Sequence, residues 1–330
     1  MGEGLTDTPE WGGHGSGHVP VLLKEAIDFL AIKRGGTYID ATVGLGGHSF
    51  EIAKRLGAPG HLIGLDKDPA ALAIARKRLA TQGPSTSPSD SKSESEDVAR
   101  DHKAVQRDWP KITLIHGSFA ELAERCEVKS ADGILADLGL SSLQLDNAAR
   151  GFSFQAEGPL DMRMDPQAEL TAEQVVNQVD EVTLANLIYE FGEERRSRRI
   201  ARAIVRSRPI QTTAQLVDVV SAAARPMNPA QRRIHPATRT FQALRIFVNH
   251  ELDDLRELLK AAPQVLKPSG RLLIISFHSL EDRIVKDALR DGVKRDLYKL
   301  LVKKPVTAGK EEIDRNPRSR SAKMRVAERI

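Results

Sequence analysis

Short apolar runs alternate along this chain with stretches whose apolar residues recur at helical spacing. Strands are predicted where the runs occur, at 37–42, 61–66, 112–116, 131–137, 271–277 and 324–330. Helical spacing fills the intervals, and it predicts a helix over 19–30 and one long helix over 238–259. Strands and helices that alternate in this way form βαβ units with parallel strands. The pattern therefore predicts an α/β fold built on a mostly parallel sheet.

Two segments interrupt the alternation. Residues 82–108 are rich in Ser, Asp, Lys and Glu. They cannot bury apolar area, so we predict a disordered loop there. Residues 142–234 carry several helical patterns and no convincing strand, which predicts an inserted helical domain. The sheet domain then comprises residues 1–141 and 235–330.

Charge is distributed unevenly in a mildly basic chain of net charge +4. Residues 195–208 hold seven arginines and no acid, and residues 315–329 hold six basic residues and one acid. Such a run is usually a solvated face. Two runs in one chain make binding to RNA as good an explanation as solvation. Aromatic residues make up only 4% of the chain, which disfavours a single-strand binder that relies on stacking.

Cys126 is the single cysteine, so the chain has neither an internal disulfide nor a cysteine-based zinc site. A reducing, cytoplasmic location is expected, because residues 1–18 carry the pattern of neither a signal peptide nor a transit peptide. No apolar run approaches the length of a membrane span, so no membrane partner is expected. A homodimer is compatible with the sequence.

A glycine-rich turn follows the first predicted strand, with Asp40, Gly44, Gly46, Gly47 and His48 in one short segment. Glycines let the backbone turn sharply and approach a ligand, and the following helix offers free N–H groups. Asp40 would attract the cationic amine of S-adenosylmethionine and repel the pyrophosphate of a dinucleotide. The spacing also lacks the last glycine of the dinucleotide fingerprint. The turn therefore favours S-adenosylmethionine, with an NAD-dependent oxidoreductase as the alternative.

Two further acids end predicted strands. Asp66 stands twenty residues after Gly46, where an acid bonds ribose hydroxyls; its alternative role is to cap the next helix. Asp137 ends the fourth predicted strand and begins a polar segment that includes Ser141 and Gln144. Ligands of open parallel sheets bind at the carboxyl ends of the strands, so Asp137 should lie beside the cofactor.

Longer motifs extend from these residues along most of the chain. They occupy 40–49, 116–119, 137–146, 150–154, 158–165, 192–195, 235–243, 276–283 and 316–321. Together they resemble the RsmH (MraW) family of 16S ribosomal RNA cytosine-N4 methyltransferases. The resemblance covers His18 to Arg329. It implies a Rossmann-like methyltransferase domain with an inserted helical domain for substrate recognition.

The resemblance also implies a cofactor, a substrate and a set of contacts. The cofactor is S-adenosylmethionine, and the substrate is a cytidine in the decoding (P-site) region of 16S ribosomal RNA in the small ribosomal subunit. Implied cofactor contacts are Gly46, Gly47, His48, Asp66, Phe119 near the adenine, Asp137 and Gln144. Two features depart from the family, a longer Ser-rich connection and Val43 in place of the common phenylalanine. Neither touches the implied contacts.

Methyl transfer to a cytosine amine needs alignment and a stabilising acceptor. The lone pair of N4 is delocalised into the ring, whereas the sulfonium methyl is already activated, so no metal is expected. An acceptor near N4–H would stabilise the positive charge that develops there. Asp137 is the candidate catalytic residue; its alternative is to hold the cofactor alone. Two other functions stay open, a non-catalytic RNA-binding ribosome assembly factor and a methyltransferase acting on DNA or another amine.

Several residues outside the cofactor motifs are candidates for substrate contact. The aromatic ones could stack on an extruded base or anchor the inserted domain. Arg163 could line the cleft between the domains or form a salt-bridged hinge. Arg239 and Arg245 could meet phosphates or be solvated, and His278 is either structural or functional. These candidates are Phe152, Phe154, Arg163, Arg239, Arg245 and His278.

Overall fold

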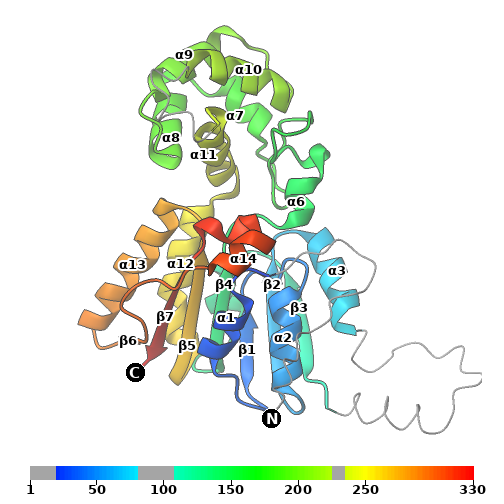
Figure 1. Cartoon of the computed structure of the whole chain (residues 1–330), viewed down its shortest axis with the longest axis vertical. Coiled ribbons are helices and arrows are strands. Elements are labelled where there is room, and N and C mark those ends of the chain that lie inside the picture. Colours follow the sequence, from blue (N-terminus) through cyan, green and yellow to red (C-terminus); the bar gives the residue numbers. More distant parts are fainter. Residues whose placement is uncertain (1–19, 81–107, 225–234) are drawn as a thin grey trace, which may run out of the picture.

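The computed structural model describes residues 20–80, 108–224 and 235–330. A sheet flanked by helices forms the lower part of the molecule in Figure 1, and a group of helices stands above it. Residues 82–107 of the predicted Ser-rich loop lie outside the described residues. Within the described part, no helix is long and apolar enough to cross a membrane.

The sheet has seven strands among the described residues, in the order β3-β2-β1-β4-β5-β7-β6. Its first five strands in that order are parallel, and β7 runs antiparallel to both neighbours. The predicted α/β fold with a mostly parallel sheet is confirmed. The strands are β1 Thr37–Asp40, β2 His61–Asp66, β3 Lys111–His116, β4 Ala131–Asp137, β5 Leu266–Ser276, β6 Tyr298–Leu300 and β7 Lys323–Arg329.

Helices cover both faces of this sheet, because successive strand residues point to opposite sides. Tyr38 joins the apolar cluster under α1 and α2, and its neighbour Ile39 joins the cluster under α12 and α13. The helices and 3-10 turns of this part are α1 Leu23–Leu30, α2 Gly47–Leu56, α3 Pro69–Ala80, η1 Phe119–Glu121, α5 Leu122–Arg125, α12 Glu251–Val265, α13 Ser279–Lys294, α14 Lys310–Arg315 and η4 Pro317–Ser321.

The upper group of helices packs around an apolar cluster of its own, which runs from Phe152 to Val248. Its elements are α6 Ser142–Asp146, η2 Ala148–Arg150, α7 Ala172–Gln178, α8 Glu181–Gly192, α9 Ser197–Arg206, α10 Thr213–Ala223 and α11 Ala237–Asn249. Phe241 and Leu244 of α11 belong to this cluster. By its packing, the helical unit therefore extends beyond residue 234, where the sequence pattern ends it.

The prediction of one long helix over 238–259 is wrong. The structure has two helices, α11 and α12, separated at His250, whose φ of 53° is left-handed. The apolar stripe continues through this break because each of the two helices buries one face. The faces pack into different cores: Val248 of α11 lies in the core of the helical unit, and Leu255 of α12 lies in the core beside the sheet. A left-handed residue after the last helical one is a common way to end a helix.

Candidate active site

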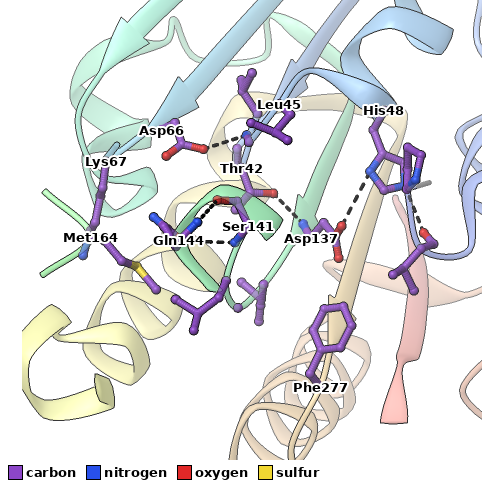
Figure 2. A pocket seen from close by; sticks show the side chains of 18 of the residues that line it. Thr42, Leu45, His48, Asp66, Lys67, Asp137, Ser141, Gln144, Met164 and Phe277 are labelled. Carbon is purple, nitrogen blue, oxygen red and sulfur yellow. Dashed lines mark hydrogen bonds and ion pairs between the residues drawn. The ribbon is translucent and has the colours of Figure 1, made fainter. Parts of the chain in front are cut away.

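A cavity opens at the carboxyl ends of the central strands (Figure 2). It is lined by the glycine-rich turn after β1, by Asp66 of β2, by Phe119 after β3, by Asp137 of β4 and by Phe277 after β5. Strand order reverses between β1 and β4, and such a switch point is where open α/β sheets bind their ligands.

The structure brings most of the predicted cofactor contacts together. Those lining the cavity are Gly44, Gly47, His48, Asp66, Phe119, Asp137 and Gln144. Gly46 does not line it. A Cβ on Gly46 would come within 3.2 Å of Ala75 of α3, and its φ is 79°, so glycine there permits both the turn and the close approach of that helix.

Asp40 is also absent from the cavity lining, although the sequence predicted that it would meet the amine of the cofactor there. The side chain is fully buried. It accepts hydrogen bonds from the Ser49 hydroxyl at 2.6 Å and from the Thr42 backbone N–H at 3.2 Å. Burial raises the pKa of Asp40 to about 6. Asp40 therefore stabilises the glycine-rich turn through these hydrogen bonds, on the side away from the cavity.

Asp66 faces the cavity from the end of β2. Its Oδ2 accepts a hydrogen bond from Gly44 N at 2.7 Å, and its Oδ1 accepts one from Asp68 N at 2.8 Å. Each carboxylate oxygen has a second lone pair, so both can still accept from ligand hydroxyls. Burial raises the pKa of Asp66 to about 6.

Asp137 lines the cavity and lies between His48 and Phe277 in Figure 2. Its Oδ2 is 3.7 Å from Nδ1 of His48. Its Oδ1 is buried and has no hydrogen-bond partner in the described part of the chain. Burial raises the pKa of Asp137 well above its usual value, and Asp40, Glu281 and Glu312 raise it further. The side chain as a whole is 19% exposed, so a cation or a hydrogen-bond donor in the cavity can approach this carboxyl group.

His48 is oriented by the N-terminal segment. Its Nε2 lies 3.0 Å from the carbonyl oxygen of Val21, which can only accept a hydrogen bond. The ring therefore donates from Nε2 and turns Nδ1 toward Asp137.

A fully buried carboxylate, Asp68, links the cavity to the helical unit. It accepts hydrogen bonds from Gln144 Nε2 at 3.1 Å and from the Arg150 guanidinium at 2.7 Å. It also caps α3 through Ala70 N, which is the role that the sequence suggested for it. The contact with Arg150 could not be inferred from spacing, because 82 positions separate the partners.

Arg150 and Asn249 hold the loop of residues 162–164 at the cavity by hydrogen bonds. Arg150 donates to the carbonyl oxygens of Arg163 and Met164, both at 2.8 Å. Asn249 accepts from Met164 N at 2.6 Å and donates to Met162 O at 2.7 Å. Met164 lines the cavity as a result. Arg163 does not line it and instead pairs with Asp161 at 2.7 Å, as a salt-bridged hinge would.

The two candidate phenylalanines lie in the helical unit, outside the cavity lining. Phe152 is buried in the helical core, and the Arg150 guanidinium lies over its ring. Phe154 stacks on His235 with ring centres 4.8 Å apart and meets the edge of Phe241. Both positions favour the anchoring role over stacking on an RNA base.

The remaining candidates form ion pairs. Arg239 pairs with Glu194 at 3.5 Å. Arg245 is held by both oxygens of Glu251, at 2.8 and 2.7 Å. His278 lies 3.1 Å from Glu281.

Glu251 and Glu281 line the cavity, and neither was singled out from the sequence. Burial alone would raise the pKa of Glu281, but His278 and Arg245 hold it below its ordinary value. Ligand atoms of Glu251, His278 and Glu281 lie within 4.8 Å of one another, as in a metal site. Both oxygens of Glu251 accept hydrogen bonds from Arg245, however, so Glu251 is held in an ion pair.

The second basic run contributes a further lining residue. Arg318 reaches the cavity from η4 and donates to Ser142 Oγ at 2.6 Å and to Asp146 Oδ1 at 2.7 Å. The charge pattern indicated the segment but not this residue, because only the fold brings the end of the chain over α6.

Known proteins resemble this chain over nearly its full length. Residues 15–330 match the model of the MraW methylase family. A protein of Koribacter versatilis (strain Ellin345) is 68% identical, over 94% of this chain and 94% of its own. One from Acidobacterium capsulatum is 58% identical over 94% and 98%, and one from Sorangium cellulosum (strain So ce56) is 46% identical over 96% and 92%. Each of the three bears the name Ribosomal RNA small subunit methyltransferase H. This chain therefore belongs to the MraW methylase family.

Proposed function

We propose that this protein transfers a methyl group from S-adenosylmethionine to the exocyclic N4 amine of a cytidine in the decoding region of 16S ribosomal RNA. The observation that carries the proposal is the carboxyl group of Asp137, which lines a cavity at the switch point of the sheet together with Asp66 and the glycine-rich turn. The small-subunit RNA methyltransferases that the chain matches support the substrate class.

The residues present fit S-adenosylmethionine. Asp66 would accept the ribose hydroxyls, Phe119 would lie near the adenine, and the turn from Gly44 to His48 would surround the methionine moiety. Buried carboxyl groups with raised pKa values suit a cationic ligand, since its charge favours their ionised form. When bound, the cofactor supplies an activated methyl group on a sulfonium cation.

Asp137 would act on the acceptor. An ionised carboxylate at this position accepts a hydrogen bond from N4–H, which orients the amine and stabilises the positive charge that develops on it. His48 Nδ1 lies 3.7 Å from Oδ2 of the same carboxyl and would form an ion pair with it when the ring is protonated. The chain's contribution is therefore alignment and charge stabilisation.

A transfer experiment tests the proposal. Purified protein is incubated with tritiated S-adenosylmethionine and small ribosomal subunits from cells that lack this methyltransferase. Label in the 16S RNA is expected. Cofactor binding without transfer to subunits or free 16S RNA would move the assignment to another acceptor, and no cofactor binding would favour the RNA-binding assembly factor.

Cofactor affinity should rise with pH between about 5 and 7. The pKa of Asp66 is about 6, and its ionised form is the better acceptor for ribose hydroxyls, so the affinity is lost as the carboxylate takes up a proton. If only the ionised form binds, affinity at pH 5 is about tenfold weaker than well above pH 6. Calorimetric titration of S-adenosylmethionine measures this, and Asp66→Asn should weaken binding and flatten the profile. A profile of the unchanged protein that is flat over this interval would contradict the assignment of Asp66.

Exposed arginines on α9 should contribute to affinity for the RNA. Arg198, Arg199 and Arg206 are exposed on the helical unit. Their joint replacement by glutamine should raise KM for subunits and reduce the log–log dependence of binding on salt by roughly 2–3, since each phosphate contact contributes about 0.7–0.9. Cofactor affinity should stay unchanged. Lys24→Gln and Lys54→Gln on α1 and α2 are the matched control, and an equal effect of that pair would sink the assignment of α9.

A further inference from the structure

We infer that Phe277 is the surface on which the acceptor base stacks, at the opposite end of the cavity from the adenine of the cofactor. The inference rests on the proposed function and adds how the cytosine ring is held during transfer. Phe277 was not singled out from the sequence, where it is one of nine phenylalanines.

Phe277 is fixed at the edge of the cavity. It directly follows β5, and its backbone N–H donates to Glu281 Oε2 at 2.8 Å. Its ring packs in part against the apolar cluster under α1 and α2, and in part lines the cavity. Figure 2 shows the ring near Asp137, on the side away from His48. A planar group placed on this ring would therefore lie beside the carboxyl that we assign to N4–H.

Two phenylalanines line the cavity in the described chain, and they lie far apart. Phe119 follows β3 and Phe277 follows β5, with β2, β1 and β4 between these strands. Four strand spacings of about 4.8 Å put the strand ends about 19 Å apart. Asp66 of β2, next to β3, places the nucleoside of the cofactor at the Phe119 end. Phe277 is then available to the second ring system in the reaction, which is the base.

Gly139 keeps a space open next to the ring. Its φ is 103°, and a Cβ added to it would lie 3.4 Å from Cδ2 of Phe277. A larger side chain there would occupy the room beside the ring. At position 139 the loop after β4 therefore presents only backbone to the ring, which suits a flat ligand.

Phe277 and Asp137 would contribute differently to binding of the base. Stacking holds any base, because every base has a π-face, so Phe277 would supply affinity and set the plane of the ring. Asp137 would then select a base with an exocyclic amine by accepting from it. An extruded base bound in this way matches how proteins hold unstacked nucleotides of RNA and DNA.

Matched variants of the two phenylalanines test the inference. We expect Phe277→Leu to lower kcat/KM for small ribosomal subunits about tenfold, while Kd for S-adenosylmethionine stays within about twofold. Phe277→Tyr keeps an aromatic face and should lose less than the leucine variant. Phe119→Leu should show the opposite result, a weaker Kd for the cofactor. Thermal denaturation checks that each variant is folded, and Phe277→Met replaces the leucine variant if that one is not.

The outcomes separate this inference from the proposed function. Transfer by the unchanged protein is measured first, and its absence would overturn the proposed function together with the inference. With that transfer present, two results overturn the inference alone. One is a leucine variant with full kcat/KM, and the other is a leucine variant whose Kd for the cofactor weakens as much as its kcat/KM falls.

Discussion

Asp137→Asn is expected to lower the rate of methyl transfer at saturating cofactor by about 100-fold or more, within the range seen when an acid–base group or a stabilising hydrogen-bond partner is removed. Asparagine keeps the shape but lacks the charge that stabilises the developing cation on N4. The fold should tolerate the change, because Oδ1 has no hydrogen-bond partner within the described residues. Burial already favours the neutral form of this group, as its raised pKa indicates.

The measurement compares rate with affinity. Single-turnover transfer to small subunits gives the rate, and calorimetry gives Kd for S-adenosylmethionine. Asp66→Asn is the control at the neighbouring strand end; it should weaken Kd and change the saturated rate less. If Asp137→Asn reduced affinity and rate by equal factors, Asp137 would be a cofactor-binding residue only.

Asp68→Ala is expected to lower the free energy of unfolding by about 3–5 kcal/mol, the usual effect of removing one partner from a buried ion pair. Asp68 is fully buried, and its loss leaves the Arg150 guanidinium without its carboxylate. Gln144 and the N-terminus of α3 lose an acceptor at the same time. Urea unfolding followed by circular dichroism measures the change.

A double substitution shows whether the uncompensated charge is the cause. Arg150→Met, added to Asp68→Ala, should recover part of the loss, because the guanidinium no longer lacks a partner. The exposed pair of Lys24 and Asp28 is the control, and Asp28→Ala should have little effect. A loss below about 1 kcal/mol in Asp68→Ala would contradict the role of this pair in joining the two parts of the molecule.

The parallel strands were predictable because each carries its own apolar run, and the helices between them carry their own periodicity. The end of α11 could not be predicted in the same way. An apolar stripe continues from Val248 to Leu255, although these two residues pack into different cores. Periodicity records that a face is buried; it does not record which neighbour buries it.

The expectation that ligands bind at the carboxyl ends of parallel strands located only part of the site. Asp66 and Asp137 line the cavity, as expected, but Asp40 at the end of β1 points away from it to Ser49. Successive strand residues face opposite sides, so a strand end alone does not decide where its last side chain points. Phe277 and Arg318 could not be placed beside Asp137 by any spacing, because the helical unit separates them from it in the sequence.

The most direct test of the account is to locate the transferred methyl group. After reaction with unmethylated small subunits, the 16S RNA is cut into fragments and digested to nucleosides, and both are analysed by mass spectrometry. The account predicts one N4-methylcytidine in a fragment from the decoding region, and much less of it when Asp137→Asn replaces the unchanged protein over the same reaction time. A methyl group on a ribose, on a ring carbon or on another base would contradict it.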